Sequence, residues 1–566
     1  MRPTSSIFLH SSILPLTRTF PLANVVPRPP RPSLHCVHPR PTSWYSSMVS
    51  PNHRPTGETR TKTIVVLGSA YGGSRAAKIL SESLPAGWRL VVIDRNTHFN
   101  HVYAFPRYTV LSKHAAKGYV PRDHTFDLST ESAKREALIE STSSTPSSSS
   151  SADPEPTGLP TPPLTPSASN DNLKRSKRPS RREFIHASVV KLDQHSVTIT
   201  RPGPYKAPAE DGTAITGPSG HFEGPEETIE FDYCLYALGA ALPDPTNPWS
   251  EHPNIPLEVV HDHTEHGLGS KRWGIKWMEQ RAENLKKAQR IVIVGAGALG
   301  IQFASDLKDV YPEKQVTLLH SRTRLMPIYP QEMHDEIMKG LNKLGVNVVL
   351  GERVVEWPDS PERLDGRIKK VVTDKGSEFE ADLVLPCTGQ KPHSQYMEQL
   401  CPDAISPSSK RIRVLPTLQV SSDPNTERHT LERLANLSIS SSPSPSSSRS
   451  TSPSSSPIES HGDLSHIFAI GDCADTGAIQ AGHTAYWMGE VAARNILRLI
   501  DREEGRKNEE LEVYKYGKPA IKVTLGLVDA VISNAEGTVP NSEGQEDMSS
   551  RLIWDSHGAG HLPDDA

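Results

Sequence analysis

Two glycine-rich segments, VVLGSAYGG (65–73) and VIVGAGALG (292–300), have the composition and spacing that bind a pyrophosphate. In a G-x-G-x-x-G arrangement the first glycine permits a tight turn, and the second lets the backbone approach phosphate. The third lets the following helix pack closely on the preceding strand. Each segment follows a short apolar run and precedes a helical pattern, so the positive end of a helix would face the phosphates.

The first segment departs from the pattern at one position. Gly68, Ala70 and Gly73 occupy the three glycine positions, and alanine is the smallest change that could stand at the second. Asp94 ends the next predicted strand, where an acid hydrogen-bonds a ribose hydroxyl. Glycines alone would also suit a strand-to-helix turn that binds nothing, but strand, helix and acid together favour a nucleotide site. Its predicted residues are Gly68, Ser69, Ala70, Tyr71, Gly72, Gly73 and Asp94.

The second segment keeps all three glycines, Gly295, Gly297 and Gly300. No acid ends the strand that follows; the segment HSR (320–322) stands there instead. A missing acid and a nearby arginine tolerate a ribose 2′-phosphate, which favours NADPH and leaves NADH open. The alternative is that Arg322 is only a surface charge.

Short branched apolar runs alternate with helical patterns along the chain, which is typical of buried parallel strands in an α/β protein. The predicted strands are 63–68, 89–94, 290–295, 315–320 and 381–386, and helices are predicted within 74–84 and 299–311. We therefore expect two Rossmann-like domains, the second inserted in the first. One would hold a flavin permanently, and the other would present a nicotinamide that arrives, donates hydride and leaves.

Charge and cysteine content argue against a nucleic-acid-binding protein and against a disulfide-stabilised protein. The formal net charge is −4, so the sequence has no electrostatic footprint for nucleic acid. The five cysteines form no C-x-x-C pair, which argues against a disulfide framework and for a reducing compartment. No metal site is expected. No run approaches the roughly 18 apolar residues of a spanning helix, so we expect a soluble or peripheral protein.

Three segments are predicted to lie outside the folded core. Residues 1–57 carry six arginines and no acid, which fits a mitochondrial transit peptide; a disordered tail, or translation from Met48, is the alternative. Two serine- and proline-rich inserts, 129–182 and 438–460, cannot bury enough apolar surface to offset the entropy of ordering them.

The ordered set of motifs resembles flavoproteins with two dinucleotide-binding domains, the superfamily of type II NADH dehydrogenases and apoptosis-inducing factor. Within it, the chain is similar to the apoptosis-inducing-factor-homologous, ferroptosis-suppressor flavoproteins and their fungal relatives. The motifs that carry this are VVLGSAYGG (65–73), HFNHVYAFPR (98–107), ASVVKLD (187–193), YALGA (236–240), VIVGAGALG (292–300), YPEKQVTLLHSR (311–322), LVLPCTGQKP (383–392) and IFAIGDCAD (467–475).

The resemblance implies roles for particular residues. The 68–73 loop would bind the FAD pyrophosphate, Arg107 would lie near the FAD phosphates or flavin, and Val189 would contact adenine through its backbone. Gly471 would let the backbone approach the cofactor, and Asp472 would bind the ribityl chain. The helix opened by QAGHTAYW (480–487) would face the flavin, and its dipole would stabilise the reduced anion. The second loop, with Arg322, would take NADPH or NADH.

The expected domain organisation follows from these motifs. It comprises a targeting or disordered segment 1–61, an FAD-binding domain in two parts, 62–265 and 396–500, a nicotinamide-binding domain 266–395 and a C-terminal region 501–566.

The expected activity is hydride transfer from NAD(P)H to FAD, followed by electron transfer to a small acceptor such as a quinone. No protein nucleophile is required, and no catalytic side chain is assigned with certainty; His483 and Tyr486 are weak candidates for protonating the acceptor, against a packing role. Cys473 has no partner cysteine and is predicted to be a small buried side chain. A ferredoxin or rubredoxin reductase and an apoptosis-factor-like signalling flavoprotein are the alternatives. The expected location is mitochondrial, with the cytoplasm and peripheral membrane contact as alternatives.

Overall fold

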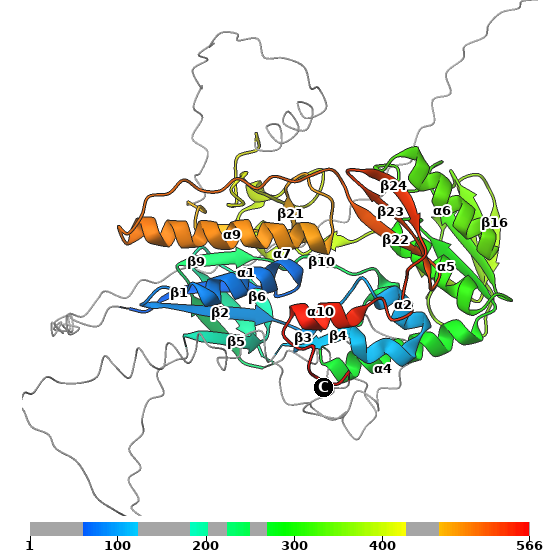
Figure 1. Ribbon diagram of the computed structural model, residues 1–566, viewed down its shortest axis with the longest axis horizontal. Coiled ribbons are helices and arrows are strands. Elements are labelled where there is room, and N and C mark those ends of the chain that lie inside the picture. The colour runs from blue at the N-terminus through cyan, green and yellow to red at the C-terminus, as the bar shows by residue number, and fades with distance from the viewer. Residues whose placement is uncertain (1–59, 123–180, 202–223, 250–268, 426–462, 565–566) are drawn as a thin grey trace, which may run out of the picture. The chain divides into compact units, whose positions relative to one another are not determined.

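The computed structural model describes residues 60–122, 181–201, 224–249, 269–425 and 463–564 (Figure 1). The predicted targeting segment 1–61, apart from residues 60 and 61, lies outside the described residues, as does the second predicted insert. So does the first insert, except for its last two residues.

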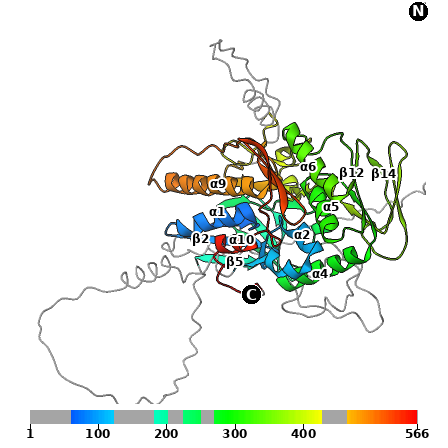
Figure 2. The same ribbon diagram turned by 45° about the vertical axis from the view of Figure 1, so that its right-hand side comes forward.

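A five-stranded parallel sheet forms the first Rossmann-like unit. Its strands, in spatial order, are β20 (Ile467–Ala469), β9 (Tyr233–Tyr236), β1 (Lys62–Leu67), β2 (Trp88–Asp94) and β5 (Arg182–His186). Helices α1 (Tyr71–Glu82) and α9 (Gly482–Glu503) run side by side along it (Figures 1 and 2). The sheet is thus completed by a strand that comes more than 200 residues after its neighbour β9.

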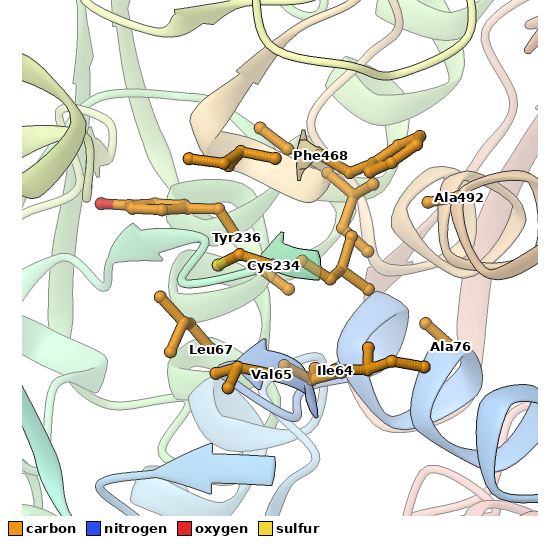
Figure 3. Packing of buried hydrophobic residues seen from close by; sticks show 14 of the residues in the cluster. Ile64, Val65, Leu67, Ala76, Cys234, Tyr236, Phe468 and Ala492 are labelled. Atoms are coloured by element: carbon orange, nitrogen blue, oxygen red, sulfur yellow. The ribbon is translucent and has the colours of Figure 1, made fainter. Parts of the chain in front are cut away.

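The core of this unit explains why its strands are apolar along their whole length. Every residue of β1 after Lys62 is buried, because helices or loops cover both faces of the sheet. Figure 3 shows Ile64 and Phe468 packed toward the helices, where Ala76 of α1 and Ala492 of α9 approach them. Small residues at these helical positions allow close helix packing on the sheet.

A four-stranded parallel sheet forms the second Rossmann-like unit. In spatial order its strands are β13 (Asn347–Leu350), β12 (Gln315–His320), β11 (Arg290–Val294) and β17 (Leu383–Pro386), with α5 (Ala298–Val310) and α6 (Gln331–Leu344) packed on it. An antiparallel sheet of β14 (Val354–Glu356), β15 (Lys369–Thr373) and β16 (Glu378–Ala381) adjoins it. All of these lie between β9 and β20 in sequence, which confirms the predicted α/β fold with one unit inserted in the other.

Shorter elements connect and flank the two sheets. They are β3 (His98–Asn100), α2 (Phe105–Val110), a 3-10 helix (Ser112–Gly118), β4 (Tyr119–Pro121), β6 (Ser188–Leu192), β7 (Ser196–Thr200), β8 (Glu226–Glu230), β10 (Ala240–Ala241), α4 (Lys271–Lys287), β18 (Lys391–Pro392), α7 (Gln395–Leu400), β19 (Ile412–Arg413) and β21 (Ala474–Asp475).

The C-terminal region adds a three-stranded antiparallel sheet and one short helix. The strands are β22 (Ile521–Leu525), β23 (Asp529–Asn534) and β24 (Gly537–Asn541), followed by α10 (Ser550–Ser556). Buried side chains of β22 and β23 join the core around α5 and α6 (Figure 1). The C-terminal residues therefore help to hold the second unit.

The first predicted insert extends two residues too far into the fold. Arg182 begins β5 and donates to the Ser81 carbonyl, and Arg181 donates to the carbonyls of Leu84 and Pro85. These two arginines therefore anchor a strand at the edge of the sheet. Within the described ranges, no helix is long and apolar enough to cross a membrane.

Candidate functional site

A cleft opens where the carboxyl ends of β1, β2, β9 and β20 meet the N-termini of α1 and α9. This edge is the usual ligand site of an open parallel sheet. The cleft is lined by nine of the residues predicted from the sequence for the first cofactor: Gly68, Ala70, Tyr71, Gly72, Gly73, Asp94, Val189, Gly471 and Asp472. The structure brings these residues together from four segments; Ser69 and Arg107 are not in the lining.

The glycine loop has the backbone geometry that a phosphate cradle needs. Gly68 has a φ of +85°, and a Cβ there would lie 2.5 Å from the Ala237 carbonyl oxygen. A Cβ on Gly73 would lie 2.0 Å from the Gly68 oxygen. Ala70 instead caps α1 with a φ of −74°, a conformation open to any residue, so alanine fits at the second position. The loop consists of small residues and precedes a helix N-terminus, so it fits the pyrophosphate of FAD.

Asp94 is held in its charged form beside this loop. Its carboxylate accepts hydrogen bonds from the Ser69 N–H at 2.7 Å and the Asn96 N–H at 2.8 Å, and it pairs with Arg122 at 3.1 Å. Burial alone would raise the pKa of Asp94, but the charge of Arg122 and these hydrogen bonds lower it to about 2. Ser69 therefore orients Asp94 from behind the cleft, and the ribose contact of Asp94 stays a prediction.

Asp472 and the first turn of α9 line the cleft beside the glycine loop. Asp472 lies in a single turn of 3-10 helix after β20, and burial raises the pKa of its carboxyl while the charge of Arg411 opposes the shift. Ala481, Gly482 and Ala485 of the first turn of α9 also line the cleft, and that turn carries no acid. The positive end of the helix thus points at the cleft, as the resemblance to the flavoproteins implied.

Close backbone contact fixes α9 against α1. A Cβ on Gly72 would lie 2.5 Å from the Ala485 oxygen, and a Cβ on Gly489 would lie 2.3 Å from the Gly72 oxygen. Any larger residue at either glycine would push the two helices apart. The same contact therefore sets the width of the cleft.

Cys473, next to Asp472, is a buried and unreactive thiol, as predicted. It is fully buried and donates to the Ile470 carbonyl at 3.3 Å. Burial raises its pKa to about 12, so the nucleophilic thiolate is not populated near neutral pH. All four cysteines in the described segments are free and buried.

The structure does not support the proton-donor roles considered for His483 and Tyr486. Both side chains are exposed, neither lines the cleft, and the Tyr486 ring lies under the Arg75 guanidinium at 4.9 Å. The cleft-facing residues of α9 are 481, 482 and 485. His483 follows Gly482 by one residue and is turned about 100° from it around the helix axis. Tyr486 lies one turn after Gly482, and its ring packs on Arg75 outside the cleft lining.

The position predicted for Arg107 is also wrong. Its guanidinium is fully buried, pairs with Asp306 of α5 at 2.7 Å and donates to the Gly526 carbonyl at 2.6 Å. Burial raises the pKa of Asp306 to about 6, although the charge of Arg107 opposes the shift. Arg107 thus ties three parts of the chain together and does not reach the cleft.

The second glycine loop repeats the geometry of the first. Gly295 has a φ of +106°, and a Cβ on Gly300 would lie 1.9 Å from the Gly295 oxygen. A Cβ on Gly297 would meet nothing within 4 Å, so the space there is free for a ligand. This loop fits the pyrophosphate of a nicotinamide dinucleotide, and it begins the helix α5.

His320 stands where an acid commonly binds the nucleotide ribose. Its Nδ1 accepts from the Ala296 N–H at 3.2 Å, so the neutral ring carries its proton on Nε2. Burial and the charge of Arg322 lower the pKa of His320, which favours this neutral form. Arg322, two residues further along the chain, is exposed. A neutral histidine and an exposed arginine in place of an acid tolerate a ribose 2′-phosphate.

Several cleft residues were not predicted from the sequence. Arg95, Trp249, His393 and Tyr396 line the cleft, and Arg122 holds Asp94 from outside it. Arg95 directly follows Asp94, so its place in the cleft could have been predicted from its position in the sequence. Trp249 lies in a connection and Tyr396 in α7, both remote in sequence from the glycine loop, where no motif marks them.

Comparison with known proteins shows the family of the chain. Residues 62–424 match the family model described as pyridine nucleotide-disulphide oxidoreductase. The chain is 32% identical to Fe-regulated protein 8 of Mycosarcoma maydis, over 88% of this chain and 95% of that protein. It is 28% identical to human ferroptosis suppressor protein 1, over 47% of this chain and 58% of that protein.

A structural comparison supports the fold independently. The structure of NDH2 from Plasmodium falciparum in complex with NADH superposes with a TM-score of 0.51 at 10% sequence identity. The match covers 88% of this chain and 94% of that one. These comparisons confirm the resemblance to ferroptosis-suppressor-like flavoproteins and the predicted cofactors, FAD with NADPH or NADH as co-substrate. The chain belongs to the pyridine nucleotide-disulphide oxidoreductase family.

Proposed function

We propose that this flavin-dependent oxidoreductase takes hydride from NAD(P)H and delivers electrons to a quinone-like small molecule. The observation that carries the acceptor assignment is the composition of the cleft. Among the described residues, no cysteine lines it, so the chain offers no thiol pair to relay electrons to a disulfide. Electrons must therefore leave to an external acceptor.

The chain's own residues bind and orient the two nucleotides. The first glycine loop and α9 would hold FAD, with Asp472 at its ribityl chain and Val189 at its adenine. Gly295, Gly297 and Gly300 would hold the nicotinamide dinucleotide. Bound FAD would supply the chemistry, accepting hydride and passing two electrons onward.

The acceptor can be identified by stopped-flow mixing of the reduced enzyme with candidate acceptors. We expect a short-chain ubiquinone analogue to reoxidise the flavin faster than ferredoxin, cytochrome c or oxygen at equal concentration. Fast reoxidation by ferredoxin or rubredoxin and slow reoxidation by quinone would instead support the reductase alternative. Cofactor reduction by NAD(P)H with no fast acceptor would favour a signalling flavoprotein.

A mitochondrial location is proposed on the composition of residues 1–57, which the structure does not describe. Import of the full chain into isolated mitochondria with removal of an N-terminal peptide would support it. A chain left outside and uncleaved would point to the cytoplasm, with or without peripheral contact with a membrane.

NADPH is proposed as the preferred hydride donor because of Arg322 and His320. Arg322→Ala should weaken NADPH binding by about tenfold, the loss of one exposed charged contact with phosphate, and should leave NADH nearly unchanged. Arg201→Ala, an exposed arginine that follows β7 outside the second unit, serves as the control. Equal weakening of both nucleotides by Arg322→Ala would contradict a phosphate contact.

A further inference from the structure

Tyr71 and Phe99, which we call the aromatic wall, lie between the cofactor cleft and the C-terminal helix α10. The Tyr71 ring lines the cleft and lies directly on Gly482, the first residue of α9, where a Cβ would come within 2.8 Å of the ring. The Phe99 ring is fully buried and meets Tyr71 edge-on, with the ring centres 4.9 Å apart. The aromatic wall therefore forms the side of the cleft at the N-terminus of α9, where the flavin ring is expected.

The segment that carries Phe99 needs support from outside the cleft. Phe99 lies in β3, a strand of three residues that pairs only with β4, and Asn100 and Val102 just after it line the cleft. An isolated pair of strands is at best marginally stable in water. The Tyr71 hydroxyl lies 3.4 Å from Nδ1 of His101 in the same segment, so the two parts of the aromatic wall are tied together.

Helix α10 packs on the side of the aromatic wall that faces away from the cleft (Figure 1). The ring centre of His557, just after α10, lies 4.1 Å from that of Phe99. Trp554 is 1% exposed, and its indole N–H donates to the Lys117 carbonyl at 3.0 Å. The Lys271 ammonium lies 4.8 Å from the centre of the indole ring. Trp554 is thus the buried anchor of α10.

The backbone before α10 does not hold the helix in place by its own preference. Met548 and Ser549 have φ values of +57° and +53°, a left-handed conformation that residues other than glycine rarely adopt. Ahead of them, Asp547 pairs with Lys117 at 2.8 Å, and both side chains are partly exposed. The position of α10 therefore depends on its docking contacts, chiefly on the burial of Trp554.

We propose that Trp554 is a positioning residue that holds the aromatic wall in place through His557 and Phe99, and that the aromatic wall keeps water and dioxygen from the reduced flavin. Dioxygen that reaches a reduced flavin takes up two electrons from it and two protons, and leaves as hydrogen peroxide. A closed site prevents this side reaction and keeps the electrons for the intended acceptor. The inference rests on the flavin chemistry of the family and not on the quinone-like acceptor proposed above.

The test uses the full chain with its flavin bound and compares the wild type with Trp554→Ala, Trp554→Phe and a matched control, Trp88→Ala. Trp88 is also a buried tryptophan with a bonded indole N–H, which donates to Glu504 at 2.5 Å, but it lies at the end of β2 away from the cleft. Two quantities are measured. One is backbone hydrogen exchange of residues 98–103, and the other is the rate of peroxide formation per bound flavin after reduction by NADPH.

We expect Trp554→Ala to speed up both exchange and peroxide formation about tenfold or more, because loss of a large buried side chain favours local opening. Flavin content and the rate of flavin reduction by NADPH should stay unchanged. Trp554→Phe keeps a buried ring and should restore most of the wild-type behaviour. Trp88→Ala should lower the stability of the chain and leave both quantities unchanged.

A milder variant keeps the inference testable if Trp554→Ala does not fold. His557→Ala should raise both quantities in the same direction, whereas His195→Ala, an exposed histidine stacked on His466 at 4.3 Å outside the cleft, should not. Unchanged exchange and peroxide formation in the Trp554 and His557 variants, or an equal rise in Trp88→Ala, would overturn the positioning role. The expected rises together with slow reoxidation by quinone would support the positioning role and count against the proposed acceptor alone.

Discussion

Replacing Arg107 by alanine should lower the free energy of unfolding by about 3 to 5 kcal/mol, the typical result of removing one partner of a buried ion pair. Asp306 would then be left buried without its counter-charge, and the Gly526 carbonyl would lose its donor. Arg201→Ala is the matched control. Its pair with Glu227 is about half exposed, so its loss should cost about 1 kcal/mol at most.

Denaturant unfolding of the full chain, followed by fluorescence and by flavin release, measures this difference. The deficit of Arg107→Ala should grow as the pH rises from 5 to 8. With Arg107 present the pKa of Asp306 is about 6, and loss of the arginine's charge raises it further. Below about pH 6 the carboxyl is protonated in both proteins, so little uncompensated charge is buried. Above that pH the wild type releases the proton, whereas the variant must keep it or bury an unpaired charge, so its relative stability falls.

Flavin content separates this structural role from the cofactor contact predicted from the sequence. Arg107→Ala should keep its flavin in the fraction that remains folded, because the side chain does not reach the cleft. A variant with unchanged stability that lost its flavin would show that Arg107 does contact FAD.

Gly300→Ala should abolish nicotinamide nucleotide binding, whereas Gly297→Ala should not. The Cβ at position 300 would lie 1.9 Å from the Gly295 oxygen, so the loop or α5 must move. Such overpacking typically destabilises a protein by about 1 to 3 kcal/mol. Here the displaced atoms belong to the loop that would bind the pyrophosphate. The Cβ at position 297 meets no protein atom within 4 Å.

Gly297→Ala should therefore fold normally. It should weaken NADPH binding by about tenfold at most, because the added methyl group would contact only the ligand. The first loop already carries alanine, Ala70, at its corresponding position. Both variants should keep FAD, because their loop belongs to the second sheet. Titration calorimetry with NADPH measures the effect, and wild-type affinity in Gly300→Ala would contradict this account of the loop.

The sequence predicted those parts of the fold that depend on local pattern. The strands predicted at 63–68 and 89–94 are observed at Lys62–Leu67 and Trp88–Asp94, because continuous apolar runs beside glycine loops have one stable arrangement in α/β proteins. The glycine positions were also predictable, because the backbone geometry there excludes other residues.

The roles that were wrong depend on tertiary contacts that sequence does not contain. Arg107 follows a family motif, but its partners, Asp306 and Gly526, lie about 200 and 420 residues away. His483 and Tyr486 lie in the correct helix, but neither lines the cleft, and Tyr486 packs on Arg75 of another helix. Trp249 carries no local signal, because its place in the cleft arises from contact with Asn96 in another segment.

The most direct test of the central claim, that this chain passes hydride from NAD(P)H to its own FAD, is anaerobic titration of the purified full-length protein. We expect a yellow protein with the two visible flavin bands and one FAD per chain. Its 450 nm region should bleach on addition of NADPH, and more weakly on addition of NADH. A correctly folded protein that carries no flavin, or a flavin that neither nucleotide bleaches, would contradict the account.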